Sequence, residues 1–191
     1  GYQVFSLSRQ TRVSRNGVEF KSPLNGNKIF MTPEKSIETQ INLGSDIMMI
    51  FDECTPYTAT RDEVKKSMEL SLYWAELSKK ANNTTMPLFG IVQGGMHNDL
   101  REISLNELTK HNFDGYAIGG LSVGEPSDIR NDIVEHIGCK LPEGKPRYLM
   151  GVGKPIDIIY AVREGIDMFD CVIPTRNARN GQLFTNLGNL N

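Results

Sequence analysis

An acidic residue and two arginines lie close together in the segment Gly165–Gly181. Asp170 follows apolar residues that are typical of a buried strand, and Arg176 and Arg179 come shortly after it, three residues apart. A carboxylate at a strand end can act as a nucleophile, and a guanidinium offers planar donors that suit phosphate. The segment therefore predicts a reactive carboxylate beside an anion-binding loop. The alternative is a structural ion pair between Asp170 and one of the arginines.

The elements that must position these residues follow two patterns. Before about residue 32, short apolar runs and Asn-Gly pairs predict an antiparallel hairpin system with strands over 4–7, 18–22 and 28–31. Afterwards, apolar runs alternate with helical patterns, which predicts βα units and a parallel sheet. The predicted strands are 46–52, 88–93, 115–120, 148–152 and 168–173, and the predicted helices are 33–44, 60–82, 98–110, 127–137 and 155–164.

Five such units predict an α/β fold in a single domain. A complete (β/α)8 barrel needs about 250 residues, so the 191 residues would form an incomplete barrel. An open doubly wound sheet is the competing architecture. In either case, parallel strands bring their carboxyl ends to one face. The strands end at Asp52, Gln93, Gly119–Gly120, Met150 and Asp170, which predicts one shared site.

The composition excludes several classes of protein. With 39% hydrophobic and 23% charged residues, the chain is typical of a folded domain and not of a disordered one. A net charge of −2 excludes nucleic-acid binding by bulk positive charge, so RNA contacts would come from local basic loops. The three widely spaced cysteines and the lack of a long apolar run predict a cytoplasmic protein with no membrane partner.

Several segments together resemble the tRNA-guanine transglycosylases of bacterial type. They are Gly1–Leu7, Phe51–Tyr57, Gly90–Gly95, Gly115–Glu125, Tyr148–Pro155 and Met168–Arg176. The resemblance covers essentially the whole chain and implies a partial TIM-barrel catalytic domain over residues 1–191, without the family's N-terminal strands and C-terminal zinc subdomain. It implies exchange of the wobble guanine of tRNAs with a G-U-N anticodon for the aminomethyl-deazaguanine precursor of queuosine.

The resemblance also assigns roles to individual residues. Asp170 matches the family nucleophile, which would form a covalent intermediate with ribose in a double displacement. The residues that match the base pocket are Gly1, Tyr2, Asp52, Gln93, Gly120, Leu121, Glu125 and Met150. The residues that match the RNA-contacting segments are Gly151, Val152, Gly153, Lys154, Pro155, Ile156, Asp157, Thr175, Arg176, Asn177, Ala178 and Arg179.

Within the base pocket, the resemblance has Asp52 accept from the N–H groups of guanine and Gln93 donate to its carbonyl. Tyr2 and Met150 would sandwich the base, although ordinary core packing is the alternative for both. Glu125 would help to hold the backbone for the aminomethyl group, or would be a plain acidic residue at a helix entry. Val123, where eukaryotic relatives carry glycine, favours the precursor over the bulkier queuine.

Two features of the family have no counterpart in this sequence. The family's proton-transfer aspartate would precede Gly1 by three residues, and a chain that begins with glycine in mid-pattern predicts a fragment. The cysteines and histidines also lack the spacing of the family's zinc site. We therefore expect no metal and little or no turnover in this segment alone, and a structural zinc and a homodimer in the full-length protein.

Two other functions stay open at this point. One is a non-catalytic tRNA-binding subunit of a transglycosylase heterodimer, which would not need a nucleophile. The other is a TIM-barrel glycosidase, which would need a second carboxylate about 5 to 10 Å from Asp170.

Overall fold

The fold begins with a small antiparallel sheet in the computed structural model, which describes residues 11–190. Its strands are β1 (Arg12–Ser14), β2 (Gly17–Lys21) and β3 (Lys28–Met31), in the order β1-β2-β3. Arg15 and Asn16 form the turn between β1 and β2, and Gly17, the first residue of β2, has a φ of 145°. The prediction of hairpins is therefore confirmed for the second and third strands. The predicted strand over 4–7 lies outside the described residues.

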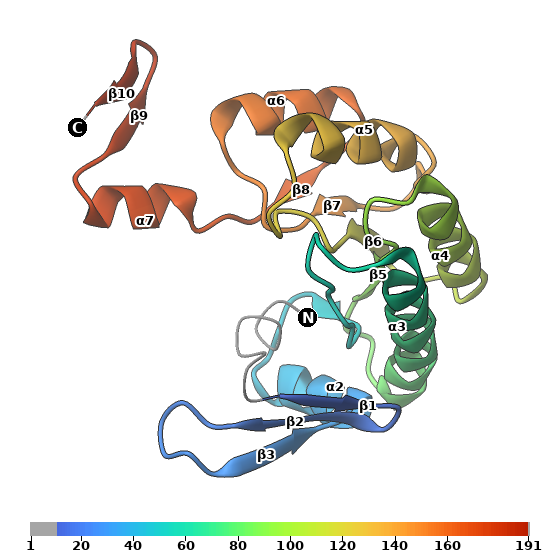
Figure 1. Cartoon of the computed structure of the whole chain (residues 1–191). Coiled ribbons are helices and arrows are strands. Elements are labelled where there is room, and N and C mark those ends of the chain that lie inside the picture. The colour runs from blue at the N-terminus through green and yellow to red at the C-terminus, as the bar shows by residue number, and fades with distance from the viewer. Residues whose placement is uncertain (1–10, 191) are drawn as a thin grey trace.

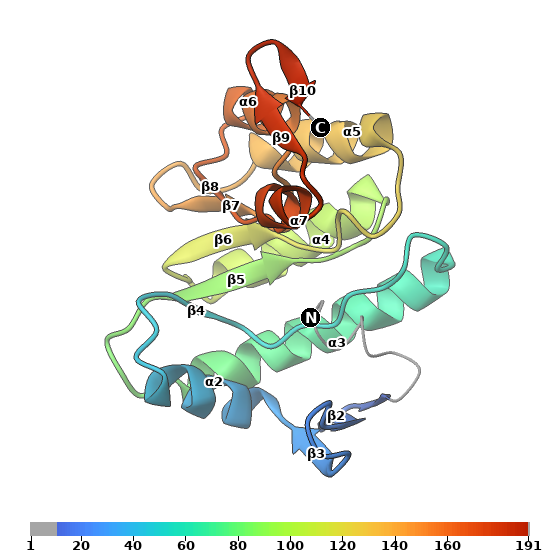
Figure 2. The same ribbon diagram turned by 90° about the vertical axis from the view of Figure 1, so that its left-hand side faces the viewer.

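The centre of the molecule is a five-stranded parallel sheet that curls into a half-barrel (Figure 1). Its strands, in spatial and sequence order, are β4 (Met48–Met49), β5 (Leu88–Val92), β6 (Gly115–Ile118), β7 (Arg147–Leu149) and β8 (Met168–Phe169). A doubly wound sheet reverses its strand order at a switch point. The unbroken order β4 to β8, visible in Figure 2, confirms the incomplete barrel and rules out the open sheet.

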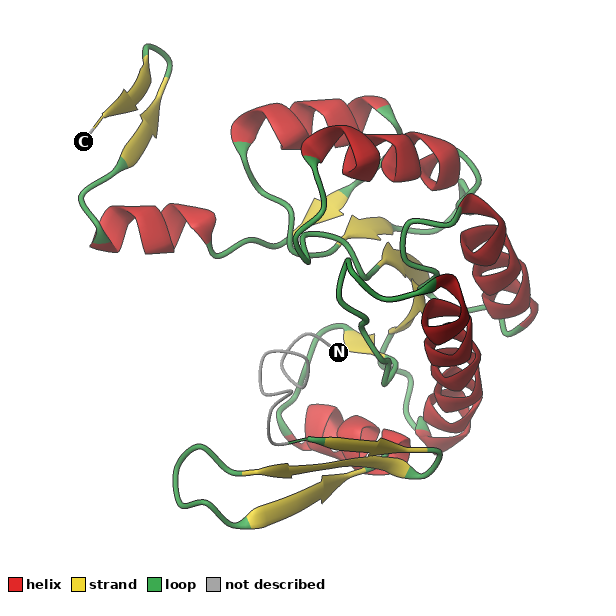
Figure 3. Cartoon of the chain, in the orientation of Figure 1, coloured by secondary structure: helices red, strands yellow, loops and turns green. Residues whose placement is uncertain are grey.

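Helices cover the outer, convex face of this sheet, as the red ribbons of Figure 3 show. They are α2 (Pro33–Asn42), α3 (Arg61–Ala81), α4 (Asn98–Lys110), α5 (Ser127–Gly138) and α6 (Pro155–Arg163), each within two residues of its prediction. Local sequence sets their starts. Thr60 and Glu63 form the expected capping box at the start of α3. The Thr32 hydroxyl accepts from the backbone N–H of Lys35 at the start of α2.

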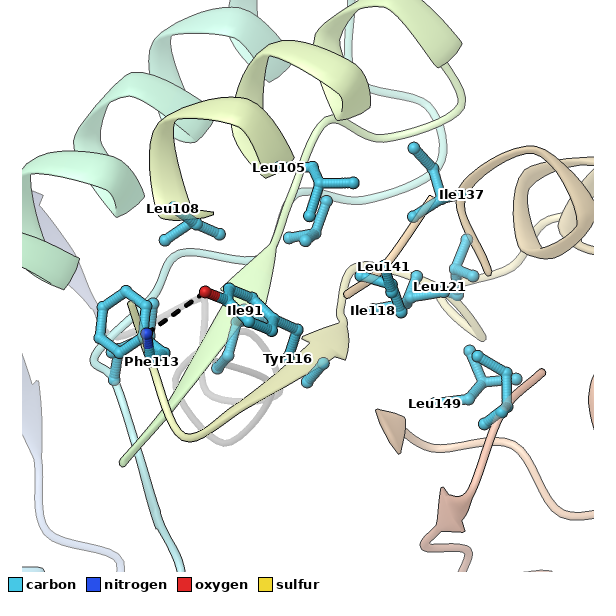
Figure 4. Close-up of a cluster of buried hydrophobic side chains, with 14 of the residues drawn as sticks. Ile91, Leu105, Leu108, Phe113, Tyr116, Ile118, Leu121, Ile137, Leu141 and Leu149 are labelled. Atoms are coloured by element: carbon cyan, nitrogen blue, oxygen red, sulfur yellow. Dashed lines mark hydrogen bonds between the residues drawn. The ribbon is translucent and has the colours of Figure 1, made fainter. Parts of the chain in front are cut away.

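The main core lies between the sheet and its outer helices (Figure 4). Leu105 and Leu108 of α4 pack toward Ile91 of β5 and Ile118 of β6, and all four side chains are at most 4% exposed. The backbone N–H of Phe113 donates to the Tyr116 hydroxyl at 3.3 Å, so that this buried polar atom has a partner. Burial of this apolar surface fixes the strands and therefore the positions of their carboxyl ends.

The register of the sheet aligns these ends. Val92 pairs with Ile118, Ile118 with Leu149, and Leu149 with Phe169. The next residue along each strand is Gln93, Gly119, Met150 or Asp170, so these four positions follow one another along the rim. The predicted gathering of strand ends at one face is confirmed.

The segment after β8 differs from its prediction. Residues 170–173 are not part of the strand, and Arg176 and Arg179 lie on a short helix, α7 (Ile173–Arg179), and not in a loop. Pro174 explains the difference, because proline fits the first turn of a helix, where its missing N–H would have no partner. An unpredicted hairpin of β9 (Leu183–Thr185) and β10 (Gly188–Leu190) follows, and both elements extend away from the half-barrel (Figure 1).

The other strands are also shorter than predicted, because buried apolar residues continue past the paired segment. Ile50 and Phe51 follow β4, and Val152 follows β7, and all three are buried without extending their strands. Within residues 11–190, no helix is long and apolar enough to span a membrane.

Candidate active site

Asp170 lies directly after β8 with an exposed side chain that is held by two donors. Its Oδ1 accepts from the Tyr148 hydroxyl at 2.6 Å and from the backbone N–H of Gly151 at 2.8 Å. Burial raises the pKa of Tyr148, and its hydrogen bond to Asp170 raises the pKa further, so the hydroxyl keeps its proton. Both of these hydrogen bonds go to Oδ1, and no described residue donates to Oδ2 of Asp170.

The arginines predicted beside Asp170 do not pair with it. Among residues 11–190, no ion pair joins Asp170 to Arg176 or Arg179, and both arginines are exposed on α7. The helix α7 extends away from the sheet (Figure 1). The structural ion pair is therefore not formed, and the role of the arginines in RNA binding stays a prediction.

Asp52 and Gln93, which follow β4 and β5, meet in the structure. The Gln93 amide Nε2 donates to Asp52 Oδ2 at 2.8 Å, and the two residues are 4% and 8% exposed, respectively. Gly119 and Gly120 lie against the same amide. A Cβ on Gly120 would lie 2.4 Å from Gln93 Oε1, and Gly120 has a φ of +65°. This position therefore needs glycine for both space and backbone conformation.

The loop after Gly120 is stabilised by contacts of its own residues. Leu121 is 5% exposed and packs into the main core, so its side chain points away from solvent. The Glu125 carboxylate accepts from the backbone N–H groups of Ser122 and Val123, the second at 2.8 Å. Glu125 therefore fixes the backbone of the loop and makes no side-chain cap for α5.

The predicted substrate and RNA residues around β7 have mixed environments. Met150 is half-buried and packs against the main core. Val152 and Gly153 are buried, and a Cβ on Gly153 would overlap the Cys171 side chain at 2.1 Å. Lys154 is exposed at the start of α6. Gly1 and Tyr2 lie outside the described residues.

Asp157 is buried and pairs with Arg130 of α5 at 2.6 Å. Its carboxylate is thus engaged in joining α6 to α5. Its predicted contact with RNA, like those of the other eleven residues of the two segments, stays a prediction.

Three residues near the site were not singled out from the sequence: Tyr148, Cys54 and Arg101. Tyr148 precedes Met150 by two positions, so the alternation of a strand could have indicated that both belong to one face. Burial, followed by the negative charge of Asp52, raises the pKa of Cys54 to about 12, so this residue is a thiol and not a nucleophile at neutral pH. Arg101 lies seven residues before the buried Leu108, so helical periodicity could have indicated that it lies on the buried face of α4.

A pocket of about 220 Å³ lies beside these strand ends. Its lining includes Tyr57, Gly95, Gly120 and Val123. A wider groove of about 590 Å³ lies between α2 and the end of α3, and none of the predicted site residues lines it. Within the described residues, no group of three or more histidine, cysteine or acidic side chains could hold a metal ion.

A curled parallel sheet with helices outside and polar residues at its carboxyl ends defines the class of βα-barrel proteins, whose sites lie at that face. Comparison with known proteins identifies the family. The family described as "Queuine tRNA-ribosyltransferase" matches residues 1–191. The chain therefore belongs to the queuine tRNA-ribosyltransferase family.

Curated relatives agree with this assignment. Proteins named queuine tRNA-ribosyltransferase from Idiomarina loihiensis and Vibrio campbellii are 61% and 60% identical, over 189 and 192 residues. A protein of the same name from Photobacterium profundum is 59% identical over 192 residues. Each alignment covers 98% of this chain and 50% or 51% of the relative, so the chain spans about half the length of the curated relatives it matches.

Proposed function

We propose that the protein containing this chain is a tRNA-guanine transglycosylase, a pentosyltransferase that exchanges the wobble guanine of tRNAs with a G-U-N anticodon for the aminomethyl-deazaguanine precursor of queuosine. The observation that carries the proposal is the shared rim of the half-barrel. There, the Asp170 carboxylate follows β8, the Asp52–Gln93 pair follows β4 and β5, and glycine backbone follows β6.

The proposed reaction is a double displacement. Oδ2 of Asp170 attacks C1′ of the ribose, the glycosidic bond breaks, and its electron pair leaves with N9 of guanine, which takes a proton from a general acid. The incoming base then attacks C1′ and loses its proton to a base, and the C1′–Oδ2 bond breaks to restore the carboxylate. Tyr148 and Gly151 orient Asp170 through Oδ1 and leave Oδ2 for the attack.

Base recognition would use the Asp52–Gln93 pair. Asp52 would accept from the N–H groups of guanine, and Gln93 would donate to the guanine carbonyl. In the structure, the hydrogen bond between these two side chains keeps buried polar groups partnered, which avoids the cost of leaving them unsatisfied. Gly120 and Leu121 would present backbone, and Met150 and Tyr2 would contact the faces of the base. Half-buried Val123 would favour the smaller precursor.

The tRNA would bind through its anticodon loop. Exposed Arg176 and Arg179 on α7, with Lys154 at the start of α6, would contact phosphates around the wobble nucleotide. A homodimer, a structural zinc in the full-length protein and a cytoplasmic location follow from the family resemblance and belong to the same proposal.

Exchange of labelled guanine into tRNA tests the proposal in the full-length protein. Wild type should exchange guanine, and Asp170→Asn should lose exchange and the complex with tRNA that survives a denaturing gel. Undiminished exchange by Asp170→Asn would sink the nucleophile assignment. Tight tRNA binding without exchange or a covalent complex in wild type would instead favour a non-catalytic subunit.

A further inference from the structure

Arg101 of α4 is fully buried, and its guanidinium joins three backbone carbonyl groups. Nε donates to Gly95 O at 2.7 Å, Nη1 to Val92 O at 3.1 Å, and Nη2 to Gly119 O at 2.9 Å. The first two carbonyls belong to β5 and the loop after it, and the third follows β6. One side chain therefore connects the carboxyl ends of two neighbouring strands.

Burial of the Arg101 charge costs free energy unless the guanidinium makes favourable interactions. None of the ion pairs formed within residues 11–190 includes Arg101, and its hydrogen-bond partners in this part of the chain are three backbone carbonyls. The negative charge of Glu125 adds a favourable interaction without a direct contact. Burial lowers its pKa to about 10, which still leaves the guanidinium charged at neutral pH. A buried charge without a carboxylate in direct contact is unfavourable compared with an apolar side chain of similar size. Packing of α4 alone does not require arginine here.

The bridged carbonyls surround the residues of the base pocket. Gln93 lies between Val92 and Gly95 in the sequence, so the carbonyls on both of its sides are held by the same guanidinium. Gly119 directly precedes Gly120, whose α-carbon lies against the Gln93 amide. The guanidinium therefore fixes the backbone on each side of Gln93 and just before Gly120.

Glycines make the close approach possible. A Cβ on Gly94 would lie 2.7 Å from the backbone nitrogen and 2.8 Å from the Cγ of Arg101. A Cβ on Gly120 would lie 3.7 Å from Nη2 of Arg101 and 2.4 Å from Oε1 of Gln93. Gly95 and Gly120 also line the pocket of about 220 Å³ beside the strand ends.

We propose that Arg101 is a positioning residue for base recognition, which sets the Gln93 amide and the Gly120 backbone in the geometry that receives a purine. The proposal rests on the proposed function. It predicts that loss of the guanidinium weakens binding of the free base and leaves tRNA binding by the distant α7 arginines unchanged. Asp170 directly follows β8, which lies two strands beyond the bridged pair, and is not part of this network.

The test measures equilibrium binding of labelled guanine and of tRNA to the full-length protein, at a temperature where thermal unfolding shows each variant to be folded. Arg101→Met keeps a long side chain and removes all three hydrogen bonds. Because hydrogen bonds of charged groups are individually substantial, guanine Kd should rise about tenfold or more, and tRNA Kd should stay within about twofold. Arg101→Lys, which keeps the charge and fewer donors, should lie between Arg101→Met and wild type.

Trp74→Phe is the matched control. Trp74 is also fully buried, and its Nε1 donates to a backbone carbonyl, that of Arg15, at 2.8 Å, but it belongs to the core beside the N-terminal sheet. It should lower thermal stability without changing guanine Kd.

Unchanged guanine Kd in folded Arg101→Met, or an equal rise in Trp74→Phe, would overturn the proposal. If Arg101→Met does not fold, unchanged guanine Kd in Arg101→Lys overturns it in the same way. Wild type that binds guanine without exchanging it would refute the proposed function, while the Kd ratio would still decide the role of Arg101.

Discussion

Loss of the hydrogen bond from Tyr148 to Asp170 should shift the equilibrium between free enzyme and covalent intermediate in a defined direction. Tyr148→Phe removes one hydroxyl, which donates to Oδ1 of Asp170 at 2.6 Å, and keeps the ring in place. In the double displacement, Asp170 is negative before attack and becomes a neutral ester in the covalent intermediate. The hydroxyl therefore stabilises the free carboxylate more than the intermediate, and its removal should favour the intermediate.

The size of this shift follows from the two states of the acceptor, Oδ1 of Asp170, which belongs to a charged carboxylate before attack and to a neutral ester afterwards. A hydrogen bond to a charged group contributes about 1.5–3 kcal/mol and one to a neutral group about 0.5–1.5 kcal/mol, so the difference is about 1–1.5 kcal/mol. This corresponds to about a five- to tenfold shift toward the covalent complex. The Gly151 N–H still donates to the same oxygen at 2.8 Å, which keeps the effect from being larger.

The assay is the covalent fraction of tRNA on a denaturing gel, at equilibrium with a fixed guanine concentration. The raised pKa of Tyr148 also predicts how the covalent fraction depends on pH. A group with a raised pKa in the folded protein keeps its proton, and therefore its hydrogen bond, until the pH passes that pKa. The hydroxyl stays protonated to about pH 10, so the ratio of variant to wild type should not change between neutral pH and that value.

Tyr160→Phe is the control for this prediction. It removes a hydroxyl that donates to Glu135 at 3.0 Å, and both residues lie on outer helices. The covalent fraction should not change in this variant. A covalent fraction in Tyr148→Phe that is unchanged or lower than in wild type would show that the Tyr148 hydroxyl does not stabilise the free carboxylate more than the intermediate.

Three further predictions follow from other parts of the site. Gly120→Ala should abolish measurable guanine binding and destabilise the fold, because the new Cβ would lie 2.4 Å from Oε1 of Gln93. Gly26→Ala is the control, since Gly26 has a similar positive φ and its Cβ would have nothing within 4 Å. This control should lower the free energy of thermal unfolding by only about 1 kcal/mol, from backbone strain. Equal losses in the two variants would contradict the close contact. The double variant Arg176→Ala/Arg179→Ala should weaken tRNA binding and leave guanine binding unchanged. The slope of log Kd against log salt concentration, measured by filter binding, should fall by up to about two. An unchanged slope would exclude phosphate contacts by these arginines. Cys54, with its pKa raised to about 12, should react with iodoacetamide at pH 8 far more slowly than a free thiol in solution, and mass spectrometry that finds rapid alkylation would contradict its burial beside a carboxylate.

The sequence predicted best those features that depend on local chemistry. Thr60 and Glu63 specify the start of α3 whatever lies around it, because both partners of the capping box are three residues apart. The order of βα units also follows from periodicity, and with it the register that places Gln93, Gly119, Met150 and Asp170 along one rim.

Features that depend on packing between distant segments could not be predicted in the same way. Strand ends were placed too late, because apolar residues such as Ile50 and Val152 are buried whether or not they pair. The sequence does not predict helix α7, because Pro174 suits the first turn of a helix as well as the end of a strand. The three carbonyl partners of Arg101 come from strand β5 and from the loops after β5 and β6, so the sequence could place this arginine on a buried face but not identify what it binds.

In the proposed reaction, Asp170 forms the covalent bond to ribose. The most direct measurement is tryptic digestion of the denatured covalent complex with RNA, followed by fragmentation of the modified peptide in a mass spectrometer. Cleavage after Arg163 and Arg176 releases residues 164–176. The ribose adduct should lie on Asp170 in this peptide. An adduct on Asp52, Asp167 or any other residue would contradict this assignment.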